Sequence, residues 1–267
     1  MKDKRVLIIS PEVVPYLPQT EQAINSFKIP KSINDSGGQI RIFTPRYGLI
    51  NERRHQLHEV IRLSGMNLVI NDMDTPLIIK VASIPKERMQ VYFIDNEDYF
   101  KRRAILRDSK GKLFSDNDER MIFFTKGVIE TVKKLNWSPD IIHIQGWFTS
   151  LFPLYLKTYF KDDAIFSESK IVCSIYPKDF DGVISKTFKQ KVEFDGIPES
   201  EIFDLSKSDY NNLTKLSIAH ADAFVLHGDS IDQEIVEVIK KSKKPYLSQT
   251  DSENEKSYVD FYKENLS

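Results

Sequence analysis

The hydrophobic and polar positions of this chain form two alternating patterns, short continuous apolar runs and longer stretches with apolar residues at helical spacing. The clearest example lies at residues 139–159. Isoleucines surround His143, which indicates a short buried strand that begins after Pro139-Asp140 and ends at Gly146. Large apolar residues then recur at helical spacing over residues 147–159. A strand that leads directly into a helix is the unit of an open α/β sheet, whose ligands bind beyond the carboxyl ends of the strands. We therefore expect His143 to Trp147 to lie at any cleft of the molecule.

The same two patterns recur along most of the chain. Continuous apolar runs predict further buried strands at residues 5–10, 39–44, 170–175 and 223–226. Helical spacing predicts helices from residue 20 to Gly37-Gly38, with Pro30 as a kink or restart, and over residues 116–134, 212–221 and 230–241, the last capped by Ser230. Alternating strands and helices predict the α/β class. We expect a single Rossmann-like domain with a mostly parallel sheet and helices on both faces.

Two regions depart from this alternation. Residues 55–100 contain four short strand-like runs, at 60–63, 67–70, 77–82 and 91–94, which predict an inserted β-ribbon. Residues 98–116 are charged and irregular, and their arginines and lysines suit either a solvated loop or a phosphate-binding loop.

The domain is expected to span residues 1–242. Residues 243–267 are polar, and we expect either a C-terminal tail or a closing helix that docks through Tyr258, Phe261 and Tyr262.

Composition narrows the classes of function. The 267 residues carry a net charge of −1, and no basic stripe interleaves with the aromatic residues, which argues against nucleic-acid binding. No apolar run approaches the length of a membrane span, and no secretory signal precedes the first strand. Together with a single cysteine, Cys173, which we expect to be a buried apolar filler, this predicts a cytoplasmic protein. His55 and His58 lack a third ligand, so we predict no metal and no cofactor.

Five motifs occur in an order and spacing that together identify a family. They are Ser10-Pro11-Glu12-Val13 with Pro15-Tyr16, Pro45-Arg46-Tyr47-Gly48, Asp116-Asn117-Asp118-Glu119-Arg120, Pro139-Asp140-Ile141-Ile142-His143 with Trp147, and Asn212-Leu213-Thr214-Lys215. From about Lys4 to about Asp229 the chain resembles the N-terminal half of bacterial glycogen synthases and plant starch synthases. That resemblance implies the N-terminal Rossmann-like domain of a GT-B glycosyltransferase, and transfer of glucose from ADP-glucose to an α-1,4-glucan. It implies these cleft residues: Glu12, Tyr16, Arg46, His143, Gln145, Trp147 and Tyr176.

Three motifs of the family are altered here. Its Lys-Thr-Gly-Gly-Leu, whose glycines let backbone N–H groups approach phosphates, corresponds to Pro18-Gln19-Thr20-Glu21-Gln22, which places a carboxylate there. Its His-Asp-Trp corresponds to Gln145-Gly146-Trp147, and its Thr-Ile-His-Asn to Ser174-Ile175-Tyr176-Pro177. The stretch after Ser230 is also too short for the family's C-terminal nucleotide-sugar-binding domain.

Two functions follow from these features. The first is a catalytically defective relative that acts as a binding or scaffolding protein, whose partner is a glucan, another protein or a second copy of itself. The alternative is an ADP-glucose-dependent α-1,4-glucan glucosyltransferase, or a subunit of one completed by a separate chain, in which Glu12, Arg46, His143 and Lys157 are the remaining polar candidates. His143 is either a core residue with a satisfied hydrogen bond or an acid/base of some other enzyme. Trp147 is expected in the core near the cleft edge, where a sugar ring would stack.

Overall fold

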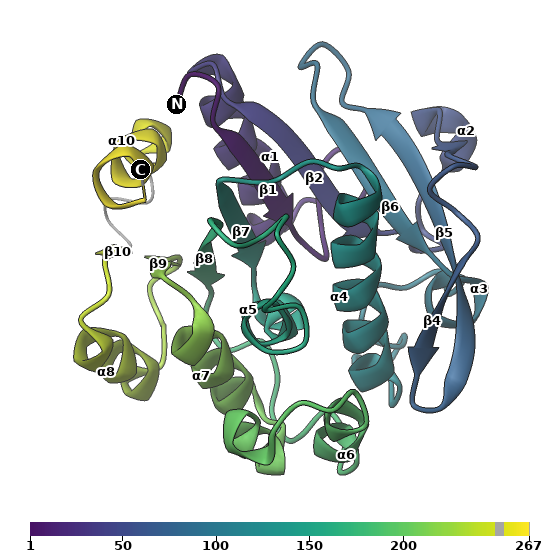
Figure 1. Cartoon of the computed structure of the whole chain (residues 1–267), viewed down its shortest axis with the longest axis vertical. Helices are drawn as coiled ribbons and strands as arrows, with labels where there is room; N and C mark the ends of the chain where they lie inside the picture. Colours follow the sequence, from purple (N-terminus) through teal and green to yellow (C-terminus); the bar gives the residue numbers. More distant parts are fainter. Residues whose placement is uncertain (249–253, 267) are drawn as a thin grey trace.

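The computed structural model describes residues 1–248 and 254–266, which form one twisted sheet with helices on both faces (Figure 1). The strand order is β10-β9-β8-β7-β1-β2-β6-β5-β3, and β4 pairs with β5. The pairs from β10 to β6 are parallel, whereas β5 runs antiparallel to β6, β4 and β3. The strands are β1 (Arg5–Ile9), β2 (Gln39–Pro45), β3 (His58–Glu59), β4 (Met66–Ile70), β5 (Met73–Ser83), β6 (Gln90–Asp95), β7 (Ile141–Gln145), β8 (Lys170–Ile175), β9 (Ala223–Leu226) and β10 (Tyr246–Leu247).

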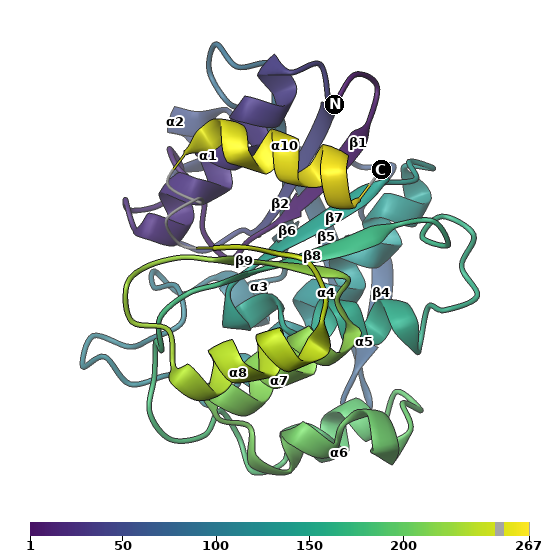
Figure 2. The same ribbon diagram turned by 90° about the vertical axis from the view of Figure 1, so that its left-hand side faces the viewer.

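The helices divide between the two faces, as Figure 2 shows. Helices α1 (Glu21–Asp35) and α10 (Glu255–Asn265) lie side by side on one face. The opposite face carries α4 (Asn117–Lys134), α5 (Leu151–Lys157) and α7 (Tyr210–His220), with α8 (Gln233–Ser242) beside α7. The short helices are α2 (Glu52–His55), α3 (Glu97–Phe100), α6 (Phe188–Glu193), η1 (Trp147–Thr149), η2 (Glu199–Glu201) and η3 (Phe203–Lys207). The predicted α/β fold with a mostly parallel sheet is therefore confirmed.

The central strands are apolar because helices cover them on both sides. Val6 to Ile9 of β1 are inaccessible to solvent, and β7 is buried along its whole length. Of the two effects predicted for Pro30, a kink or a restart, the restart does not occur, because helix α1 continues through Pro30 to Asp35. Helix α4 has Asp118 and Glu119 in its first turn and Lys133 and Lys134 in its last turn, an arrangement that the helix dipole favours.

The expected β insertion is smaller than predicted. Strand β6 pairs in parallel with β2 and so belongs to the main sheet, and residues 60–63 form a turn. What remains is β3 with the β4–β5 hairpin. Asn71 and Asp72 both adopt positive φ angles, 47° and 68°, at the tip of that hairpin, as a two-residue turn between antiparallel strands requires. The apolar content of β6 did not reveal this, because central and ribbon strands share the same composition.

Two further differences lie near the C-terminus. Helix α8 begins at Gln233 after Asp232, whose side chain accepts from the Glu234 amide, and not at Ser230. After residue 242 the chain forms the short strand β10 and then α10, in which Tyr258, Phe261 and Tyr262 are buried. Among the described residues, no helix combines the length and apolar character that crossing a membrane requires.

Candidate functional site

The candidate site lies at the topological switch point of the sheet, between the neighbouring strands β1 and β7. Strand β1 is followed by α1 on one face, whereas its neighbour β7 is followed by α5 on the other. In open parallel sheets, ligands bind in the crevice at the carboxyl ends of such a strand pair. A pocket of about 310 Å³ opens at this point. Most of its lining comes from the segments after β1, β7 and β8 and from the start of α1, and the rest from the segment before α4 and the start of α7: Pro11, Glu12, Thr20, Glu21, Gln22, Leu106, Gly146, Trp147, Phe148, Tyr176, Pro177, Asp179 and Tyr210.

The charged groups of this pocket are carboxylates. Among the described residues, none that line it is a lysine, arginine or histidine. Burial raises the pKa of Glu12, a hydrogen bond from the Thr20 hydroxyl lowers it and the charge of Asp179 raises it. Burial and then Asp229 raise the pKa of Glu21. The pocket therefore presents negative charge and hydrogen-bond acceptors to a ligand.

Two of these carboxylates are held by neighbouring side chains. The Thr20 hydroxyl donates to Glu12 Oε2 at 2.5 Å. Asp179 Oδ2 accepts from Trp147 Nε1 at 2.8 Å and lies 2.9 Å from Arg107 Nη2. The guanidinium of Arg107 is thus already paired with Asp179, so it adds no free positive charge to the lining.

The loop where the family places glycines is closed by a side chain. Gln22 Nε2 donates to the carbonyl of Gln145 at 3.0 Å. Its amide lies over Gly146, where an added Cβ would approach Gln22 Oε1 to 2.7 Å. Gly146 also has a φ of 70°, a conformation that L side chains rarely adopt. Gln22 therefore occupies the space through which a ligand would reach the backbone at this point.

The N-terminus of α1 faces the same pocket, but residues of the helix itself cap its backbone amides and compensate its positive dipole. Thr20 is the N-cap, and its Oγ1 accepts from the Ala23 amide at 3.0 Å. Glu21 places a negative charge in the first turn, where the helix dipole is positive. The positive end of the helix is thereby compensated within the chain.

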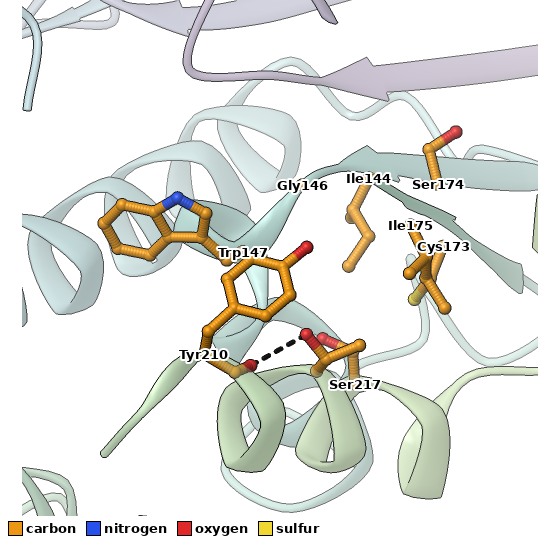
Figure 3. Close-up of a pocket in the computed structure, with 9 residues that line it drawn as sticks. Ile144, Gly146, Trp147, Cys173, Ser174, Ile175, Tyr210 and Ser217 are labelled. Atoms are coloured by element: carbon orange, nitrogen blue, oxygen red, sulfur yellow. Dashed lines mark hydrogen bonds between the residues drawn. The ribbon is translucent and has the colours of Figure 1, made fainter. Parts of the chain in front are cut away.

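A second, much smaller cavity lies behind Trp147, between the ends of β7 and β8 and the start of α7 (Figure 3). Its volume is about 10 Å³, which suits at most one water molecule. Thr214 Oγ1 donates to the Tyr210 carbonyl beside it, and Cys173, buried as expected, contributes to its wall. This cavity is too small for a substrate.

A buried polar network lies directly beneath the larger pocket. Tyr176 Oη donates to Gln145 Oε1 at 2.7 Å, and Gln145 Nε2 lies 3.3 Å from His143 Nε2. Ser174 Oγ bridges the two histidines, at 2.7 Å from His143 Nε2 and 2.8 Å from His227 Nε2. Asn25 Nδ2 lies 3.2 Å from His227 Nδ1 and also donates to the Tyr176 hydroxyl at 3.4 Å, which closes the network into a ring, and the Tyr262 hydroxyl contacts His143 Nδ1.

The amide of Asn25 determines the protonation of both rings. An NH₂ group only donates, so His227 Nδ1 accepts and His227 Nε2–H donates to Ser174. Ser174 then donates to His143 Nε2, and His143 Nδ1–H donates to Tyr262. Both rings are neutral in this arrangement. Burial lowers the pKa of His143 to about 3, with a further contribution from His227, and burial lowers the pKa of His227 to about 3.

The sequence-predicted site residues separate into three groups. Glu12, Trp147 and Tyr176 line the pocket, and His143 and Gln145 lie beneath it in the network. Trp147 is only 6% exposed, so its ring offers little face for a sugar. The other three lie elsewhere: Tyr16 packs on His55 and Phe93, Arg46 pairs with Asp95 and Glu52, and Lys157 lies near Asp222.

His143 is a core residue with satisfied hydrogen bonds, because it is fully buried and does not line the pocket. Sequence reasoning did not place Asp179 in the site, although its position soon after a predicted strand end was a usable signal. For Asn25 and Tyr262 the sequence held no such signal, because their partners are 202 and 119 residues away.

The fold and the position of the pocket define an N-terminal Rossmann-like domain of the GT-B glycosyltransferase type. The family model described as "Starch synthase catalytic domain" matches residues 5–243, and the chain belongs to that family.

Curated relatives and a solved structure agree with this assignment. The glycogen synthase of Chlorobium luteolum is 35% identical over 236 residues, which cover 86% of this chain and 47% of the relative. That of Chlorobaculum tepidum is 34% identical over 236 residues, 87% of this chain and 47% of the relative. The catalytic domain of Starch Synthase IV from Arabidopsis thaliana, bound to ADP and acarbose, has the same fold with a TM-score of 0.74 at 16% identity, over 93% of this chain and 51% of that one. The chain thus spans about half the length of the curated relatives it matches.

Proposed function

We propose that this glycogen synthase-like domain is catalytically defective and acts as a binding or scaffolding protein. The observation that carries the proposal is the charge of the pocket at the end of β1: its lining includes Glu12, Glu21 and Asp179, with no cationic side chain among the described lining residues. Groups that stabilise developing charge usually supply the largest catalytic contribution. A negatively charged pocket lacks such groups and repels the diphosphate of a sugar nucleotide, which is itself an anion.

The size of this effect supports the proposal. Two like charges 4 Å apart repel by about 1 kcal/mol in water and by about 4 kcal/mol near a protein surface. Glu21 stands in the first turn of α1, which is the position where a helix N-terminus otherwise binds phosphate. Gln22 in addition covers Gly146, so the backbone there is not open to a ligand.

A neutral glucan suits this lining better than a nucleotide. Carboxylates of Glu12, Glu21 and Asp179 are acceptors for sugar hydroxyl groups, and the pocket volume of about 310 Å³ falls in the range of small-ligand sites. The same scaffolding function would also be served by binding a protein partner, including a second copy of the chain, in place of a glucan.

The direct test measures glucose transfer from ADP-glucose to glycogen by the purified chain, together with a titration of maltotriose followed by tryptophan fluorescence. We expect no transfer above a protein-free control, and a fluorescence change that saturates with maltotriose. Robust extension of glycogen would refute the proposal. In that case the alternative function holds, an ADP-glucose-dependent α-1,4-glucan glucosyltransferase or a subunit of one, which the names of the curated relatives favour.

Restoring the family's phosphate loop should restore nucleotide binding. The variant Pro18→Lys/Gln19→Thr/Thr20→Gly/Glu21→Gly/Gln22→Leu rebuilds that motif, adds a positive charge, removes a negative one and takes the Gln22 amide away from Gly146. Two charge changes at about 1 kcal/mol each predict roughly 30-fold tighter binding of ADP, measured by calorimetry. Gln39→Lys/Glu168→Gly is the control, because it changes the net charge equally at exposed residues outside the pocket lining. Equal gains in both variants would show that net charge, and not the loop, limits binding.

A further inference from the structure

The buried network connects the wall of the pocket to the C-terminal helix. Tyr262 of α10 contacts His143, which is followed in the network by Gln145 and then by Tyr176, a lining residue of the pocket. A second connection runs through stacked rings. Tyr258 of α10 stacks on His227 with ring centroids 6.4 Å apart, and His227 stacks on Tyr176 at 4.5 Å.

Helix α10 lies outside the part of the chain that the family model matches. That match ends at residue 243, whereas α10 spans Glu255–Asn265. Figure 2 shows α10 on the same sheet face as α1, across β7 and β8, which carry His143 and Ser174, and β9, which ends one residue before His227. Two tyrosines from this additional helix thus complete a network whose other members lie in the family-matched domain.

We propose that Tyr258 and Tyr262 of α10 are positioning residues, which hold Tyr176 and Gln145 in place and thereby set the shape of the ligand pocket. As a statement about ligand binding, this inference rests on the proposed binding function of that pocket. As a statement about the pocket wall, it stands on the geometry alone.

The hydrogen-bond directions give the physical route. Without the Tyr262 hydroxyl, His143 Nδ1–H has no acceptor, and a buried unsatisfied donor is unfavourable. Moving the proton to Nε2 would set it against the Gln145 amide and the Ser174 hydroxyl, both of which donate to that nitrogen. Gln145 would then have to turn its amide, and Tyr176 would lose the oxygen to which it donates. A change on α10 therefore reaches the pocket through three successive contacts, Tyr262–His143, His143–Gln145 and Gln145–Tyr176.

Hydrogen exchange of backbone amides tests this without any ligand. The amides of Gly146 and His227 bond to the carbonyls of Ser174 and Ile175 and report on the end of β8 beneath the pocket. In Tyr262→Phe we expect these two amides to exchange roughly fivefold faster, the factor of one lost buried hydrogen bond. Tyr258→Leu, which removes the ring stacked on His227, is the second variant and should raise the same two exchange rates. Amides of β2 and β6 should keep their rates. Tyr159→Phe, at a ring that is 48% exposed, is the matched control and should change neither set.

Each other outcome overturns the proposal. Unchanged exchange at Gly146 and His227 in both variants would show that α10 does not hold the wall. Equal acceleration of all amides would show that the tyrosines contribute only global stability. Because exchange is measured on the free protein, a failure of maltotriose to bind would count against the proposed function and leave this result intact. If maltotriose does bind, Tyr262→Phe should weaken it by about the same fivefold factor.

Discussion

The free energy of unfolding of this protein is expected to fall by about 4 kcal/mol between pH 7 and pH 5. His143 and His227 are buried as neutral rings, and burial lowers the pKa of each to about 3, whereas an unfolded histidine titrates near 6.5. Between these values the unfolded chain binds more protons than the folded one. The stabilisation is therefore complete above pH 6.5 and is lost as the pH falls toward 3, at about 1.4 kcal/mol per pH unit for each ring. Urea denaturation at pH 7, 6 and 5 measures it.

The variants His143→Gln and His227→Gln separate the two contributions. Each should reduce the slope of stability against pH by about one proton, whatever it does to the stability at pH 7. His58→Gln, at a histidine that is exposed on β3, is the control for the substitution itself. A slope that is the same in all four proteins would contradict the assignment of neutral buried rings.

The second large effect is expected from one buried ion pair. Lys126 on α4 lies 2.7 Å from Asp195, and both side chains are 6% exposed. Lys126 also donates to the Val69 carbonyl of β4, and Tyr155 of α5 donates to Asp195. Lys126→Met would leave the carboxylate buried without its cation, which typically costs about 3–5 kcal/mol. For a chain of this length we expect the thermal midpoint to fall by roughly 10 °C, measured by differential scanning calorimetry.

Two comparisons isolate the cause of this loss. Lys126→Met/Asp195→Asn removes both charges and should recover most of the stability, because no unpaired charge stays buried. Lys101→Met breaks the pair of Lys101 with Glu97, whose side chains are 73% and 69% exposed, and should cost less than about 1 kcal/mol. If the double variant is as unstable as the single one, lost packing and not the unpaired carboxylate explains the effect.

Local sequence was sufficient for the elements whose signals are complete within a few residues. The strands at 170–175 and 223–226 were predicted with the bounds that the structure has, because continuous β-branched and aromatic runs between helices are buried whatever their neighbours. Features that depend on distant segments, such as which strands pair, were predicted less well. Strand β6 was assigned to the ribbon because its sequence does not state which strand it pairs with, and the two residues of β10 are too few to form a pattern.

The candidate site shows the same division. The sequence was sufficient to place the motifs around Glu12 and Trp147, and the carboxylate of Glu21, at the crevice. The reason is that the carboxyl ends of the strands in an open sheet converge there. Arg46 and Lys157 were candidates by motif alone, yet Arg46 is held by Asp95 and Lys157 lies outside the pocket.

The chain's own residues determine a parallel α/β sheet, the position of the crevice and its negative charge, since each depends on local patterns and side-chain chemistry. Tertiary structure alone decided the roles of His143 and Gln22. His143 is a neutral core residue because Ser174 and Tyr262, from distant segments, complete its hydrogen bonds. Gln22 closes the loop because Gly146, 124 residues later, leaves room for its amide. The chemical character of a side chain follows from the sequence itself, whereas its burial and its hydrogen-bond partners depend on which distant segments pack together.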